Sequence, residues 1–284
     1  MNQNSSDNQS LLAEMLCIAD SKWVLGHWYA KIILNGRTVP DFSSMAGMAQ
    51  DELGHTRATM NFLEQSMGLP EHQLEFARTA DEIHSMQLLD DAPQNWADFV
   101  VTVYLAEHAL WHMLEAYTDG SSPAVANLTK KFSEEGYFHR LYIEGWTGAL
   151  DDEEKAEAAA ALPSRLAMAR QWFRGESDVS LLDADVRTQS LAICTQQFEE
   201  SVQQLAELIG VDVPAQGAEL EQPWDALRRR PQGSQMPARL WEYVVPTSEV
   251  AQMARRPLAV SIEDNIDLFN VKQVKDETAP FFDQ

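Results

Sequence analysis

Apolar residues recur every three or four positions along most of the first 210 residues, and this spacing constrains the fold more than any other feature. An α-helix places such positions on one face, so each stretch predicts a helix with one buried side. The most regular stretch follows Ser122-Pro123 and carries Leu128, Phe132 and Trp146 on its apolar face. The proline suits the first position of a helix. The fold class expected is therefore all-α, an antiparallel helix bundle.

Six long helices are expected, at about residues 10–34, 40–67, 95–117, 123–146, 151–175 and 183–210. Pro163 predicts a kink or break in the fifth of them. The connecting stretch 71–92 is polar and irregular, with room for a short helix. Beyond residue 211, seven prolines exclude long helices, while the many aromatic residues are unsuited to a free linker. We therefore expect a bundle at 10–210 and a C-terminal arm at 211–284, packed on the bundle or on a partner chain of an oligomer.

Composition excludes several classes of function. The formal net charge of −23 would repel nucleic acid, and no run of about 18 uncharged apolar residues is present to span a membrane. The first residues lack the basic and apolar regions of a signal peptide, so we expect a cytoplasmic protein. Cys17 and Cys194 fall within expected helices, where buried free thiols are favoured over a disulfide. Arg228-Arg229-Arg230 is interpreted as a solvated loop, with an anion site as the alternative.

Acidic residues interrupt the apolar faces of four expected helices, and on two of these helices a histidine shares the face. Burying an unpaired charge costs several kcal/mol. Four such acids are therefore better explained by one shared binding partner, such as a metal site, than by four unrelated burials. A two-metal carboxylate site needs one carboxylate from each of two helices and a carboxylate with a histidine from each of two others. The candidate ligands are Asp20, Glu52, His55, Glu107, Glu135 and His139.

The two carboxylate-histidine pairs differ in their spacing. Glu52 and His55 are three residues apart, whereas Glu135 and His139 are four apart. Gly136 therefore predicts a bulged turn that returns Glu135 to a bridging position. Without such a bulge, the second metal is weakly held or absent. We assign the catalytic role to the two predicted bridging carboxylates, Glu52 and Glu135.

Four segments carry a resemblance to a known family: the region of Asp20, then Gln50-Asp51-Glu52-Leu53-Gly54-His55, Tyr104-Leu105-Ala106-Glu107, and Glu134-Glu135-Gly136-Tyr137-Phe138-His139-Arg140. Across residues 10–150 the chain resembles the subunits of the bacterial phenylacetyl-CoA ring 1,2-epoxidase, within the ferritin-like superfamily. The resemblance implies a ferritin-like bundle. In that family, the catalytic subunit holds two irons, takes electrons from a reductase and inserts oxygen into an aromatic acyl-CoA. A second subunit of the same fold lacks functional iron and acts as a scaffold.

Two departures from the catalytic pattern leave alternatives open. Asp20 stands where that pattern has glutamate, and Gly136 stands where it has the glutamate three before His139. The first hypothesis is a di-iron oxygenase that uses two iron ions, or manganese, with dioxygen as co-substrate. It would oxidise an aromatic or similar small organic substrate, such as a CoA thioester, with an electron-donating reductase as partner. The alternatives are a non-catalytic scaffold subunit in a hetero-oligomer and a ferritin-like metal-handling protein.

Overall fold

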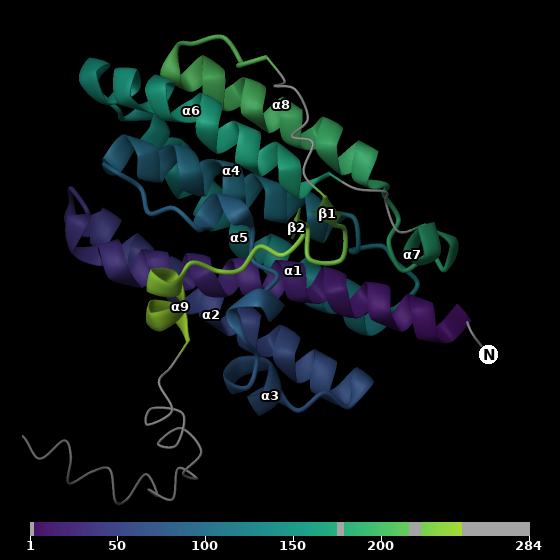
Figure 1. Ribbon diagram of the computed structural model, residues 1–284. Helices are drawn as coiled ribbons and strands as arrows, with labels where there is room; N and C mark the ends of the chain where they lie inside the picture. The colour runs from purple at the N-terminus through teal and green to yellow at the C-terminus, as the bar shows by residue number, and fades with distance from the viewer. Residues whose placement is uncertain (1–2, 175–178, 216–222, 246–284) are drawn as a thin grey trace, which may run out of the picture. The chain divides into compact units, whose positions relative to one another are not determined.

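A computed structural model describes residues 3–174, 179–215 and 223–245, and these residues form a bundle of helices (Figure 1). The long helices are α1 (Gln3–Ile32), α2 (Val39–Met67), α4 (Trp96–Glu115), α5 (Pro123–Gly148), α6 (Asp152–Trp172) and α8 (Leu191–Ile209). Shorter elements are α3 (Glu71–Phe76), α7 (Val179–Asp183), α9 (Ala238–Val244), three 3₁₀ turns (Ile33–Asn35, Ala80–Glu82, Gln87–Leu89) and a hairpin of β1 (Trp224–Asp225) and β2 (Arg230–Pro231). The prediction of an all-α, ferritin-like bundle is confirmed.

Helix α4 is the central element of the bundle. Nearly all of its residues are buried, including the two acids Asp98 and Glu107. It packs against α5, α6 and α8, whereas α1 packs along α2 on the other side, as Figure 1 shows. A helix surrounded in this way has no solvated face. The charged residues of α4 must therefore find partners inside the protein.

The ends of the helices follow from local side-chain chemistry. Thr38 and Asp41 form a reciprocal capping box at the start of α2, and Gly68 ends that helix in the left-handed conformation with φ of 70°. Helix α6 runs without interruption through Pro163, so the predicted break is wrong. Pro163 lies on the exposed face, between the buried Leu162 and Leu166. Water can solvate the carbonyl that proline leaves unpaired, and burial of the flanking leucines holds the helix together.

The expected helix at 183–210 is in fact two elements. Helix α7 ends at Asp183 and α8 begins at Leu191, where the hydroxyl of Ser190 accepts a hydrogen bond from the amide of Ile193. Between them Arg187 is fully buried and lies 3.3 Å from Glu14 of α1. The chain leaves the helical path there, and a serine cap starts the next helix.

The three consecutive arginines of the hairpin bind the bundle, so their interpretation as a solvated loop is wrong. The buried Arg229 forms an ion pair with Glu14, and the buried Arg230 forms one with Asp90. The Arg228 guanidinium donates to the carbonyl of Ile83 at 2.9 Å. Residues 211–215 and 223–245 of the arm thus belong to the same compact unit as the bundle. The predicted arm continues through residues 246–284, which lie outside the described residues.

Two smaller predictions also have an outcome. Cys17 and Cys194 are buried free thiols, as expected, and burial raises the pKa of Cys194 to about 11. Among the described helices, none combines the length and the hydropathy that crossing a membrane requires.

Candidate metal centre

Three buried side chains from three helices meet in the core of the bundle. Glu52 of α2, Glu107 of α4 and His139 of α5 each offer a donor atom, and these atoms lie within 4.8 Å of one another. Each of the three residues is no more than 3% exposed. Two carboxylates and one imidazole are hard and borderline donors of the kind that iron, manganese and zinc accept. Three of the six candidate ligands from the sequence thus lie together in the structure.

His55 completes a symmetrical arrangement around Glu52. The Nδ1 atom of His139 lies 3.3 Å from Glu52 Oε1, and Nδ1 of His55 lies 3.9 Å from the same oxygen. The outer nitrogens each meet a carboxylate: His139 Nε2 is 3.3 Å from Asp51, and His55 Nε2 is 2.6 Å from Glu135. Carboxylates in this outer position orient an imidazole so that its other nitrogen faces inward.

The two histidines carry different charges. Burial disfavours the imidazolium of His139, but the charge of Glu107 and hydrogen bonds with Asp51, Glu107 and Glu52 raise its pKa well above the ordinary value. Burial and the nearby charge of Lys22 lower the pKa of His55 far below that value. These surroundings favour the protonated form of His139 and the neutral form of His55. With its proton on Nε2 facing Glu135, His55 presents a bare Nδ1 to the centre.

A lysine ammonium lies inside this group of donors. Lys22 of α1 is 1% exposed, and its Nζ donates to Glu52 Oε1 at 2.8 Å. The hydroxyl of Tyr29, about two helical turns further along α1, donates to Glu107 Oε1 at 2.9 Å. Lys22 and His139 carry two positive charges, and Glu52 and Glu107 carry two negative ones. In the buried part of the centre, Lys22 and His139 thus lie against Glu52 and Glu107.

A family model described as the phenylacetic acid catabolic protein matches residues 1–235, which include every residue of the centre. The chain belongs to this family. A search of curated proteins found no match. Membership of the phenylacetic acid catabolic family agrees with the resemblance inferred from the sequence.

In this member of the phenylacetic acid catabolic family, several donor atoms face the interior of the centre, but they do not suit a pair of metal ions. Glu52 Oε2 and His55 Nδ1 are buried without a hydrogen-bond partner among the described residues, and with Glu107 and His139 they make a donor set for one cation. Two ions need additional carboxylates. From α1 the centre receives the cation Lys22 and the hydroxyl of Tyr29, and Gly136 of α5 has no side chain.

Asp20 is the predicted ligand that the structure separates from the others. Both of its carboxylate oxygens bind the guanidinium of Arg78, at 2.6 and 2.7 Å, and Oδ2 also accepts from the amide of His84 at 2.8 Å. Residues two apart on a helix point about 200° away from each other. Lys22, and not Asp20, therefore projects from α1 into the centre. Asp20 instead joins α1 to the segment that follows α3.

Glu135 is also placed differently from the prediction. It contacts the outer nitrogen of His55 and is 40% exposed, so it lies at the edge of the centre and does not bridge its interior. The predicted bulge at Gly136 is absent, because α5 is continuous α-helix from Pro123 to Gly148. In a regular helix the four-residue spacing puts Glu135 and His139 about 40° apart on one side of α5, where His139 is buried and Glu135 lies toward solvent.

Sequence reasoning missed Lys22, Tyr29 and Asp51. Asp51 directly precedes Glu52 and belongs to the same motif. Lys22 had a clear signal, because it is the single lysine or arginine between Met15 and Tyr29 in an otherwise mostly apolar stretch. A lone cation there predicts a buried anionic partner, because an unpaired buried ammonium is costly.

Gly136→Ala should increase stability slightly. An alanine in a regular helix gains up to about 1 kcal/mol over glycine. A Cβ at this position would meet only the Nη1 atom of Arg140, at 3.2 Å, which is the end of a flexible side chain. Urea unfolding measures the change. Gly145→Ala is the matched control on the same helix, since nothing lies within 4 Å of its Cβ position. A loss of stability in Gly136→Ala alone would mean that Arg140 is fixed in place.

Proposed function

We propose that this chain is a non-catalytic subunit of a multicomponent oxygenase of phenylacetate catabolism. In this proposal, it keeps the bundle and most of the metal-binding side chains of a catalytic homologue, while ion pairs replace the metals. Its role is to position a catalytic subunit of the same fold. Family membership supports the pathway, and the chemistry of the centre supports the assignment to a non-catalytic role.

One observation carries the proposal: the ion pair between Lys22 and Glu52. Both side chains are essentially inaccessible to solvent, and their atoms are 2.8 Å apart. A metal ion that used this oxygen of Glu52 would have to displace a buried ammonium, which would then be left without its counter-ion. Leaving a buried charge unpaired costs about 3–5 kcal/mol, so the ion pair competes directly with metal binding.

An exposed apolar surface on α5 supports the role in assembly. Tyr137, Phe138, Leu141 and Tyr142 are each between 43% and 61% exposed, and they lie one helical turn or less from His139. Aromatic residues gathered on one face are typical of protein interfaces. A catalytic subunit of similar fold is the partner that the proposal assigns to this surface.

A catalytic di-iron oxygenase is the second candidate. It is favoured by the two unpartnered inner atoms, Glu52 Oε2 and His55 Nδ1, which are available to a metal. In that case Glu52, His55, Glu107 and His139 would hold iron or manganese, and the metal would supply the activation of dioxygen. The substrate would be an aromatic compound or its CoA thioester, and a reductase would supply electrons. The protein side chains would exclude water and orient the histidines through Asp51 and Glu135.

Anaerobic loading with Fe(II), removal of unbound metal and elemental analysis distinguish the two candidates. We expect well below one iron per chain, because Lys22 already neutralises Glu52. A Glu52→Ala/His55→Ala variant gives the background from acids on the protein surface, and wild type should not exceed it by much. Close to two irons per chain, lost in this variant, would overturn the non-catalytic assignment and favour the oxygenase.

A further inference from the structure

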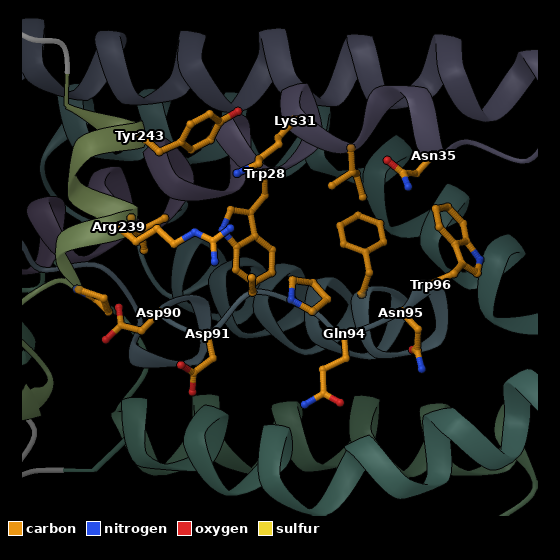
Figure 2. A pocket seen from close by; sticks show the side chains of 16 residues that line it. Trp28, Lys31, Asn35, Asp90, Asp91, Gln94, Asn95, Trp96, Arg239 and Tyr243 are labelled. Atoms are coloured by element: carbon orange, nitrogen blue, oxygen red, sulfur yellow. The ribbon is translucent and has the colours of Figure 1, made fainter.

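A second site lies apart from the metal centre, in a cavity of about 670 Å³. The end of α1, the segment 90–95, the start of α4 and helix α9 enclose it. None of the residues of the metal centre lines it. Figure 2 shows Arg239 and Trp96 at opposite ends of this cavity. The volume falls within the range of pockets that bind small molecules.

Four aromatic side chains line the cavity. Trp28 comes from α1, Trp96 and Phe99 from α4, and Tyr243 from α9. Trp28 and Phe99 are buried, so they present rigid faces to the cavity. Aromatic walls of this kind favour a flat apolar ring, which stacks on them or meets them edge to face.

The charges around the cavity favour an anion. Lys31 and Arg239 are exposed cations on its rim, and neither forms an ion pair with another residue in the described part of the chain. Lys31 Nζ lies 4.4 Å from the ring centre of Tyr243. Of the two acids at the cavity, Asp90 is already neutralised by Arg230, which leaves Asp91. Two cations against one free acid give a local positive excess in a chain with a net charge of −23.

Hydrogen bonds from the buried Arg165 hold one wall of the cavity in place. The Arg165 guanidinium donates to the carbonyl of Asp91 at 2.9 Å and binds both carboxylate oxygens of Asp98 at 2.7 and 2.8 Å. These bonds fix the segment 90–95 against the start of α4. Because the walls of the cavity are already ordered, binding of a ligand loses less free energy to ordering them.

We propose that this cavity binds a small planar aromatic molecule that carries one anionic group. The ring lies between Trp28, Phe99 and Trp96, and the anion lies at Arg239 and Lys31. This inference goes beyond the proposed function, since it does not depend on whether the centre at Glu52 holds a metal.

Calorimetric titration of the full chain with naphthalene-2-carboxylate tests the proposal, with naphthalene-2-carboxamide as the uncharged probe of the same shape. We expect the carboxylate to bind about tenfold more tightly, as a charge-assisted hydrogen bond provides. Arg239→Gln and Lys31→Gln should each weaken carboxylate binding by about tenfold and leave carboxamide binding unchanged. Lys130→Gln removes an exposed cation of α5 and should leave the affinity for both probes unchanged.

Three results would overturn the proposal. They are equal affinity for the two probes, unchanged carboxylate binding in both Arg239→Gln and Lys31→Gln, and no binding of either probe at about 1 mM. Melting curves followed by circular dichroism show whether each variant is folded. Both cations are exposed, so we expect the variants to have the same melting temperature as wild type.

Discussion

Lys22→Met lowers the free energy of unfolding by about 3–5 kcal/mol, because it removes the nearest cation from the buried carboxylate of Glu52. For a protein of this size, the melting temperature falls by roughly 6–20 °C. Methionine keeps the length of the side chain and fills the same space, so the loss reports the charge and not a cavity. Urea unfolding and thermal melts measure the effect.

Two variants serve as controls for this prediction. Lys22→Met/Glu52→Gln removes both charges of the pair and should recover much of the lost stability, since neither partner is left buried and charged. Lys130→Met removes an exposed lysine and should change stability by less than about 0.5 kcal/mol. A loss in Lys22→Met no larger than in Lys130→Met would contradict the description of Lys22 as a buried ion-pair partner.

The same Lys22→Met variant should gain a metal site. With the ammonium removed, Glu52, Glu107 and the inner nitrogens of His55 and His139 form a nitrogen and oxygen donor set suited to Zn²⁺. Zn²⁺ at a hundred times its dissociation constant would stabilise the variant by about 2.7 kcal/mol. We expect the melting temperature to rise with added Zn²⁺ in Lys22→Met and to stay constant in wild type. The same rise in both proteins would mean that Lys22 does not compete with metal.

Arg165→Met should also lower the free energy of unfolding by about 3–5 kcal/mol. Arg165 is 5% exposed and its guanidinium binds Asp98 through two hydrogen bonds. Its loss leaves that carboxylate buried and charged, and it frees the carbonyl of Asp91. Arg57→Met is the matched control, because Arg57 is exposed and its contact with Glu71 at 3.4 Å lies on the surface. Equal losses in the two variants would contradict the structural role of Arg165.

The effect of Arg165→Met should depend on pH. Burial alone would raise the pKa of Asp98, but hydrogen bonds from Arg165 and from the amide of Gln94 lower it overall. A carboxyl with a lowered pKa stabilises the fold above its unfolded pKa of about 3.9, and this stabilisation is lost as pH falls through the folded value. The difference between wild type and Arg165→Met should therefore be largest near pH 7 and smaller near pH 3.

The sequence was sufficient to predict the bundle, because helix periodicity and helix ends are local properties. Thr38, Asn95 and Asp151 cap helices within one turn of themselves, and the apolar faces lie where the spacing placed them. The misplaced ends have non-local causes. The break before α8 accompanies the buried contact between Arg187 and Glu14, which are far apart in sequence.

The site was predicted only in part, because a pattern of apolar residues identifies a buried face only when the other face is exposed. Helix α1 is buried on all sides between Met15 and Leu25, so its periodicity could not show which polar residue points to the centre. Asp20 was chosen because it was an acid, and the partner that makes its burial possible, Arg78, is 58 residues away. On α2, one face of which is partly exposed, the spacing indicated the buried face, and Glu52 and His55 both lie on it.

The hairpin contacts also determine when the protein can finish folding during its synthesis. Arg229 is 215 residues from its partner Glu14, so α1 is among the first segments made but stays incomplete until the hairpin has left the ribosome. At about 5–20 residues per second, that delay is roughly 10–40 s. For that time α1 exposes Glu14 and its apolar neighbours. A nascent chain of this kind depends on protection by chaperones more than a helical protein with only local contacts does.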